Sequence, residues 1–530
     1  MERIIKNKEN CIWFAISFVV LCVVYGSFFK DSFIMDHIAS ENAWTVAPPP
    51  ASFAYFFAQG RATTWLWTLL YYKLGVLLHV TKLHNSWPIT LAEIAALSGA
   101  MTLLHSQVRS YFEKRWQQAV AFVLILLAVV NPLYQEYFVY YAFEIAMALL
   151  MTVAAARAFK NQKYLASFIW MLLAIWTYQN FFELFFVWAS LFILLNCDLK
   201  PGIREVIEFI KAGCIGAGAV AMNLIGTKVA MWVTYGFGSA KIAVDEVALA
   251  VTGKVITNAP VVATVTEFKR FWTGDNPLLD AFWSVRNGIG VMVNNLVMPT
   301  RLMLVLSFMA SVGIITALVK KKVNLGSVIL TGLWLVFINC CYLIIYLSGI
   351  GDYSGRITWI FFGGVSTTLL LCLYAIKDLK IASYFFSGLW LVCFVVVVVF
   401  TWDYSSDFFT KCEIDRENVG KIAKAIEEYE TESGKEVTRI SVVASPNMEY
   451  ASPELKMDYS LGAYSYNCKT YNRDWSDVAL INVLTGVKRE RLAMTEEEFN
   501  DRFSDYESWN AFDITKQLKF EGDTLYWAKF

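Results

Sequence analysis

Apolar segments of about 20 residues recur along most of the chain, and they restrict its fold more than any other feature. A helix of roughly this length crosses the hydrocarbon core of a bilayer and satisfies its own backbone hydrogen bonds there. We therefore expect an α-helical polytopic membrane protein with about eleven spans. The expected spans are residues 11–29, 88–106, 117–134, 138–157, 164–178, 180–196, 212–236, 302–319, 326–347, 357–376 and 381–401.

The distribution of charge separates the chain into two parts. Residues 402–530 hold 25 acidic and 16 basic side chains, whereas residues 1–401 hold 20 acidic and 29 basic ones. We expect a transmembrane domain over 1–401 and a water-soluble α/β domain over 402–530. The patterns in the second part predict helices at 417–431, 474–484 and 495–503, strands at 438–443 and 524–530, and a tight turn at Gly522-Asp523.

Clusters of Lys and Arg fall in alternate loops, which places the N-terminus in the cytoplasm and the C-terminal domain outside. This topology predicts a multi-pass membrane protein whose C-terminal domain lies outside. In a bacterial inner membrane that side is the periplasm, where a disulfide between Cys412 and Cys468 is expected. Residues 62–80 are apolar but carry Lys73. A crossing there would invert the charge pattern, so we expect an interfacial helix on the outer side instead.

A polar patch follows the first apolar segment, at Asp31, Asp36-His37 and Gly60-Arg61. Ionisable residues at the edge of a membrane are costly to keep and point to function. Asp36 has apolar neighbours that favour a raised pKa, so it is the first candidate for a catalytic base. Asp31 is the second candidate, although a solvated residue of the interface explains it equally well.

Other polar residues of the predicted outer loops are candidates for binding a substrate. Arginine recognises phosphate through paired hydrogen bonds, which suits Arg61, Arg301 and Arg356. Gln135, Glu136 and Gln179 lie in tight outer hairpins, where they could hydrogen-bond a sugar. The alternative for the arginines is that they anchor the chain at lipid phosphates, and the alternative for the polar hairpin residues is that they cap helices.

No P-loop, zinc-ligand spacing, dinucleotide fingerprint or nucleophile elbow is present, and the chain has only four His. We expect no cofactor, no metal and no nucleic-acid partner. The partners predicted at this point are the lipid bilayer and a lipid-linked sugar donor presented from it. Glu93, Glu144 and Glu183 lie within predicted spans and would suit a transporter, but we find no internal repeat of the kind that transporters show.

The pattern as a whole resembles a known family. An acidic patch after the first helix, Gly60-Arg61 opening an apolar segment, Asn131-Pro132 in the second outer loop and Tyr178-Gln179 in the third are similar to the bacterial serotype-conversion membrane glucosyltransferases. These resemble the wider GT-C-like class, which uses polyprenyl-phosphate sugars. His37 stands where the family often has a second acid.

The resemblance implies transfer of glucose or a similar hexose from undecaprenyl phosphate to O-antigen or another surface polysaccharide, on the periplasmic side. Asp36 would act as the base, and Arg61, Arg356 and Arg301 would hold the donor phosphate. Two alternatives stay open: an O-antigen polymerase or ligase, and a lipid-sugar transporter or flippase.

Overall fold

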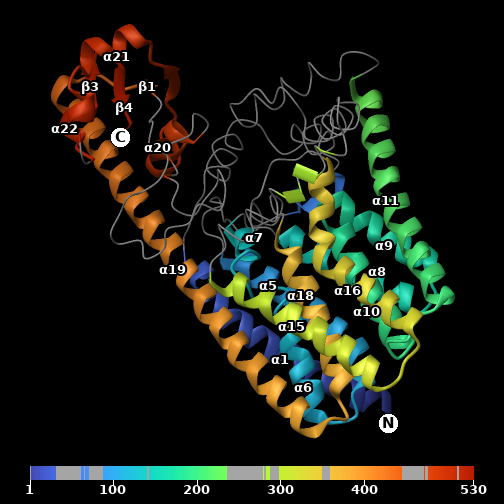
Figure 1. Cartoon of the computed structure of the whole chain (residues 1–530). Coiled ribbons are helices and arrows are strands. Elements are labelled where there is room, and N and C mark those ends of the chain that lie inside the picture. Colours follow the sequence, from blue (N-terminus) through green and yellow to red (C-terminus); the bar gives the residue numbers. More distant parts are fainter. Residues whose placement is uncertain are drawn as a thin grey trace.

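In the computed structural model of the protein, a bundle of long helices carries a small sheet region at one end (Figure 1). The structure describes residues 2–30, 61–70 without 65 and 68, 87–139, 143–235, 279, 282–283, 285–286, 298–348, 358–443, 469, 471, 476–509 and 512–529.

The bundle consists of helices that run in alternating directions between two ends. They are α1 (Glu2–Tyr25), η1 (Gly26–Phe29), α5 (Trp87–Val108), η3 (Arg109–Tyr111), α6 (Arg115–Leu126), α7 (Gln135–Val139), α8 (Phe143–Lys160), α9 (Tyr164–Thr177), α10 (Phe181–Asn196), α11 (Ile203–Tyr235), α15 (Met298–Lys320), α16 (Leu325–Cys340), η4 (Cys341–Ser348), α18 (Ile360–Ile376) and α19 (Lys380–Ser433).

Hydrogen bonds between connections define the two ends of the bundle. At the end with the short turns, here called the turn end, Tyr374 Oη donates to Asp198 Oδ1 over 3.2 Å and Gln117 Nε2 donates to the Lys377 carbonyl over 2.8 Å. At the opposite end, the loop end, the long connections start and finish. There Thr90 Oγ1 donates to the Phe28 carbonyl over 3.0 Å, which joins the two sides of the connection 31–86.

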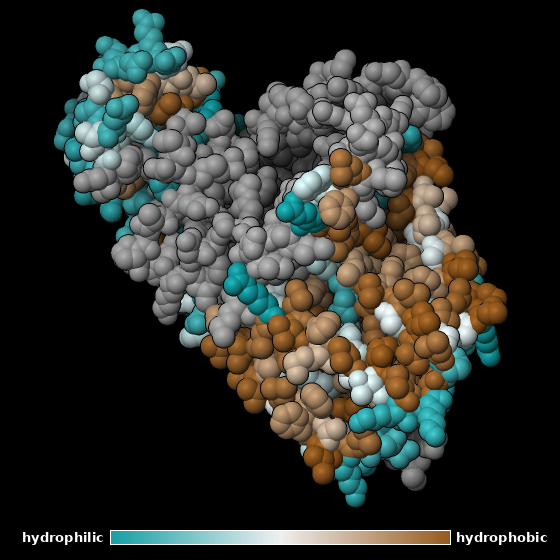
Figure 2. Space-filling view, viewed as in Figure 1, coloured by the Kyte–Doolittle hydropathy of each residue, from teal (hydrophilic) through white to brown (hydrophobic). Residues whose placement is uncertain are grey.

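Six of the described helices are long and apolar enough to cross a membrane, and a helical membrane protein is the class that they define. They cover 8–29, 87–111, 203–229, 300–320, 325–344 and part of 380–433. Figure 2 shows their apolar side chains as a brown band on the lower part of the molecule, bordered by hydrophilic residues at the bottom edge. The total of about eleven spans and the direction of insertion stay predictions.

One expected span is shorter than its apolar pattern suggests. The helix expected over 117–134 ends at Leu126, and turns follow it. The Asn131-Pro132 pair lies within these turns, and a residue before proline is driven out of the helical conformation, so no helix continues through this point. Asn131 Nδ2 donates to the carbonyls of Leu127 and Ala128 over 3.1 and 3.2 Å, which provides partners for groups that a helix would otherwise satisfy.

The helix α18 forms the centre of the bundle, and all of its residues are buried. It packs against α6, α10, α15 and α16, as expected for a helix that is apolar on every side. Gly364 permits the closest approach, because a Cβ atom there would lie 2.5 Å from the Ile338 carbonyl oxygen of α16. A Cβ atom at Gly363 would instead meet the Leu184 side chain of α10.

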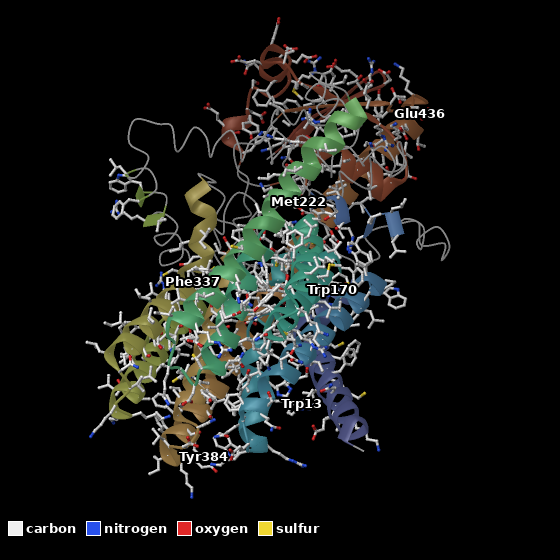
Figure 3. The ribbon with its side chains drawn as sticks, turned by 90° about the vertical axis from the view of Figure 1, so that its right-hand side faces the viewer. Trp13, Trp170, Met222, Phe337, Tyr384 and Glu436 are labelled. Carbon is white, nitrogen blue, oxygen red and sulfur yellow. The ribbon has the colours of Figure 1, made fainter. Side chains whose placement is uncertain are left out.

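The helix α19 continues without a break from the bundle into the C-terminal region. The separate helix expected at 417–431 is therefore its last part, and no change of secondary structure marks residues 401 and 402. Figure 3 places Tyr384, near its start, and Glu436, just beyond its end, at opposite ends of the molecule. Gly434 ends the helix in the left-handed conformation with a φ of 68°.

The C-terminal region contains a four-stranded sheet in the order β2-β1-β4-β3, with β3 antiparallel to β4 and the other pairs parallel. The strands are β1 (Arg439–Val443), β2 (Glu490–Ala493), β3 (Leu518–Glu521) and β4 (Thr524–Ala528), with helices α20 (Asp477–Thr485), α21 (Glu496–Arg502), η6 (Tyr506–Ser508) and α22 (Ile514–Gln517).

Local sequence signals in this region are confirmed. Gly486 ends α20, Thr495 forms a capping box with Glu498 at the start of α21, and Gly522 makes the tight turn between β3 and β4. Cys412 is buried in α19, whereas Cys468 lies outside the described residues, so their predicted disulfide stays a prediction.

Replacing Gly364 with alanine should destabilise the bundle more than the same change at Gly363. The new methyl group at 364 meets backbone, whereas at 363 it meets a leucine that can change its rotamer. We expect Gly364→Ala to lower the free energy of unfolding in detergent by about 1–3 kcal/mol. Gly363→Ala is the matched control, and an equal loss in both variants would contradict the close approach of α16 and α18.

Acid should loosen the sheet through Asp523. The Arg439 guanidinium hydrogen-bonded to Asp523 holds the pKa of that carboxyl below its ordinary value. A carboxyl whose folded pKa is depressed contributes stability above its unfolded pKa of about 3.9, and this is lost as the pH falls through the folded value. Hydrogen exchange of β1 and β4, corrected for intrinsic rates, should therefore speed up on acidification, and less so in Asp523→Asn.

The control for this experiment is Asp501→Asn, which removes an acid that is 80% exposed. It should keep the acid response of the wild-type chain. An Asp523→Asn chain with an unchanged response would show that the pair with Arg439 does not stabilise the sheet.

Candidate functional site at the loop end

The segment that Arg61 opens lies against the loop end of the bundle. Its described residues from 62 to 70 are helical. Thr64 Oγ1 donates to the carbonyl of Thr177, the last residue of α9, over 2.9 Å. Trp67 packs edge-on against Phe143 at the start of α8, with ring centroids 5.5 Å apart. Leu66 and Leu70, one turn apart, are 55% and 43% exposed, so the segment shows an apolar face to its surroundings.

Arg61 is half-buried and lies over an aromatic ring. Its guanidinium carbon is 4.8 Å from the centroid of Tyr178, in the turn between α9 and α10. Its Nε is buried and has no hydrogen-bond partner among the described residues. The carboxyl group of Glu144, in the first turn of α8, interacts electrostatically with the guanidinium. Arg61 is thus a held cation with donor capacity left over.

Two acids that the sequence places on separate helices lie within electrostatic range of each other at this site. Glu93 of α5 is 1% exposed and interacts electrostatically with Glu144 of α8. Its Oε1 has no hydrogen-bond partner among the described residues. Tyr25 and Tyr134 also lie within electrostatic range of Glu93. Two buried carboxyl groups that interact in an apolar bundle are costly to charge together.

Aromatic residues form one side of the site. Trp359, directly before α18, donates its Nε1 hydrogen to Tyr137 Oη over 2.9 Å. The Trp359 ring packs edge-on against Tyr134, and the Tyr137 ring packs edge-on against Tyr178. This wall therefore runs from α18 to the ring that carries Arg61. Sequence reasoning missed Trp359. A usable signal was its position at the start of the predicted span 357–376, three residues after Arg356 of the predicted outer loop.

The predicted sugar-binding residues have different surroundings. Gln135 is fully buried in α7 and its amide contacts α19, where the orientation that satisfies both ends donates to the Thr401 carbonyl and accepts from Ser405. Gln135 therefore joins two helices. Glu136 is buried beside it, and Gln179 is half-buried in the turn that holds Tyr178.

The remaining candidates are only partly described. Arg301 is exposed in the first turn of α15, a helix that packs against α16, α18 and α19. Asp31, Asp36 and Arg356 lie outside the described residues. Phe28 and Arg61 bracket the connection that contains both aspartates, and contacts of Thr90 and Thr64 fix both of its anchors at the loop end.

Within the described parts of the chain, no group of three or more His, Cys, Asp or Glu side chains is placed to hold a metal ion. No family model, no curated protein and no solved structure matches the chain. The class shown is thus that of a helical membrane protein, and the likeness to serotype-conversion glucosyltransferases stays a prediction.

Replacing Glu93 with glutamine should leave the fold intact and keep or raise its stability. Glutamine has the same shape and removes the like-charge contact with Glu144. We expect the melting temperature in detergent to stay level or to rise, with a gain of up to about 1 kcal/mol in the free energy of unfolding. Glu113→Gln, at an exposed acid of the turn end, is the control and should change nothing. A marked loss for Glu93→Gln alone would mean that a bound cation or partner depends on the charge.

Proposed function

We propose that the protein is a membrane glycosyltransferase that transfers a hexose from undecaprenyl phosphate to O-antigen or another surface polysaccharide, on the periplasmic side of a bacterial inner membrane. The observation that carries the proposal is Arg61, held over Tyr178 with its buried Nε unused by the described residues. A positioned guanidinium with free donors suits a phosphate oxygen.

The surroundings of Arg61 fit a donor that arrives from lipid. Leu66 and Leu70 of the same segment are exposed, so an isoprenoid chain could lie along them while its phosphate reaches Arg61. In the aromatic wall, Tyr137 and Trp359 are buried and support the half-buried Tyr178, whose ring is of the kind that sugars pack against. Arg356 and Arg301 are further candidates for the phosphate.

In the proposed reaction an acceptor hydroxyl oxygen attacks the anomeric carbon of the donor sugar. The bond from that carbon to the phosphate oxygen breaks, and undecaprenyl phosphate leaves as an anion. Asp36 takes the hydroxyl proton, with Asp31 as the alternative base. Arg61 stabilises the charge that develops on the phosphate, a role that other transferases give to a metal ion.

The pair of Glu93 and Glu144 favours a second candidate, an ion-coupled transporter or flippase of a lipid-linked sugar. Buried, interacting carboxyl groups in a bundle are the groups that carry protons in such proteins. Both acids lie in the loop-end halves of their helices, and Glu144 interacts electrostatically with Arg61. An O-antigen polymerase or ligase is the third possibility.

Mass spectrometry of the surface polysaccharide, with and without the gene, is the direct test. The transferase should add a hexose side branch at unchanged chain length, whereas a polymerase or ligase would change the length. Asp36→Asn and Arg61→Gln should each reduce the branch by about 100-fold, the usual effect of losing one charge-stabilising donor or the base. Arg61→Lys should recover part of it, because lysine keeps the charge but loses the paired geometry.

Arg115→Gln is the matched control, since this exposed arginine lies at the turn end and should not affect the branch. Membrane content and melting temperature are measured for each variant. Full branching with Asp36→Asn and Arg61→Gln, together with complete loss in a Glu93→Gln, Glu144→Gln double variant, would reject the transferase and support the transporter.

A further inference from the structure

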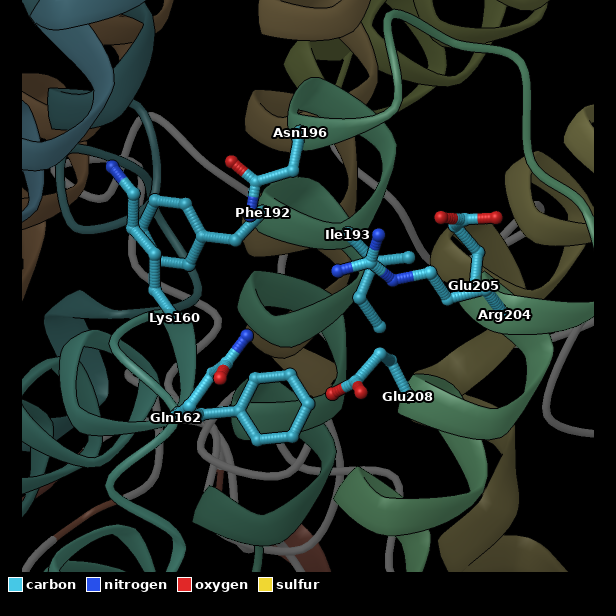
Figure 4. Close-up of a pocket in the computed structure, with 9 residues that line it drawn as sticks. Lys160, Gln162, Phe192, Ile193, Asn196, Arg204, Glu205 and Glu208 are labelled. Atoms are coloured by element: carbon cyan, nitrogen blue, oxygen red, sulfur yellow. The ribbon is translucent and has the colours of Figure 1, made fainter.

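A second polar site lies at the turn end, remote from Arg61. A cavity of about 140 Å³ opens between the end of α8, the end of α10 and the start of α11 (Figure 4). Aromatic and aliphatic side chains, among them Phe159, Phe192 and Ile193, form its base. The remaining lining residues are polar or charged: Lys160, Gln162, Asn196, Arg204, Glu205 and Glu208.

The cavity presents both signs of charge at close range. In Figure 4 the guanidinium of Arg204, the carboxylate of Glu208 and the amide of Gln162 point toward one another. Arg204 is exposed and interacts electrostatically with Glu208, and it makes no hydrogen bond to any described residue. Its donors are thus open to a ligand that contains an anionic oxygen.

The carboxylate of Glu208 has a fixed position. It accepts hydrogen bonds from Lys211 over 2.7 Å and from Tyr164 Oη over 3.0 Å. A carboxylate has about four acceptor positions, so two partners leave capacity for a further donor. Glu205 accepts from the Gly202 N–H over 2.9 Å and is likewise held in place.

The surface beside the cavity is apolar. Ile207 and Ile210 of α11 are 49% and 57% exposed, and Leu165 and Ile169 of the adjoining α9 are exposed as well. The two helices are packed together, and the Glu208–Tyr164 hydrogen bond joins their starts. A polar cavity therefore borders lipid-facing helix surface at the edge of the apolar band, which is the arrangement that a lipid headgroup and its acyl chains require.

We propose that this cavity binds the headgroup of a zwitterionic aminophospholipid, with the phosphate at Arg204 and the primary ammonium at Glu208. The acyl chains would lie along Ile207 and Ile210. Two acids and two bases line the cavity, a balance that suits a zwitterionic headgroup better than a wholly anionic one. A choline headgroup has no N–H to donate to a carboxylate. This site is separate from the proposed transferase site and does not depend on its chemistry.

Native mass spectrometry of the purified full chain, titrated with defined phospholipids, tests the proposal. We expect the ethanolamine phospholipid to bind tighter than the choline and glycerol phospholipids of the same acyl chains. Arg204→Gln and Glu208→Gln should each weaken the ethanolamine lipid by about tenfold, the value of one charge-assisted hydrogen bond. Glu208→Gln should not weaken the choline lipid to that extent, because choline has no N–H to donate to this carboxylate, whereas Arg204→Gln removes a phosphate contact that both lipids make.

Lys163→Gln is the matched control, because this exposed lysine lies in the adjoining turn but does not line the cavity. Glu208→Gln also removes the ion pair with Lys211, so the unfolding temperature of each variant is measured beside its lipid affinity. Arg204 is exposed, so Arg204→Gln is the variant least expected to affect folding. Equal affinity for all three lipids, tighter binding of the glycerol lipid, or unchanged binding in Arg204→Gln would overturn the proposal.

Discussion

The enclosure of α18 on all sides is the constraint on which the rest of the bundle depends. Every residue from Ile360 to Ile376 is buried, so each neighbouring helix is positioned by contact with this one apolar cylinder. Among the described residues, Gly364 sets the approach of α16, Trp359 at its start joins the aromatic wall, and Tyr374 near its other end contacts the turn after α10. Both candidate sites adjoin α10, which packs directly against α18.

The sequence was most informative where the signal is local. Gly486, Gly522 and the capping box at Thr495 specify their turns and caps through backbone conformation and neighbouring hydrogen bonds, and all three are found. The signal was weakest where an apolar run continues past a break. Hydropathy cannot distinguish a helix from the buried turns after Leu126, and only the Asn131-Pro132 pair indicates the difference.

The candidate site was predictable in part. A Gly-Arg pair opening an apolar segment identified Arg61, and the turn that holds Tyr178 was expected near the same side. The electrostatic interaction of Glu93 with Glu144 was not predictable, because it depends on how α5 and α8 are rotated against each other. Gln135 shows the opposite case, since a polar residue in a predicted outer hairpin is used to join α7 to α19.

The unbroken helix α19 connects distant parts of the molecule. Its 54 residues extend about 81 Å at 1.5 Å per residue. Phe408 packs against Phe28 of the bundle, and further along Tyr429 stacks on Phe520 of the sheet. Each added or lost residue between these contacts would turn the sheet by roughly 100° relative to the bundle. The helix therefore fixes the rotation of the sheet relative to the bundle. The number of residues in this segment is as constrained as its composition.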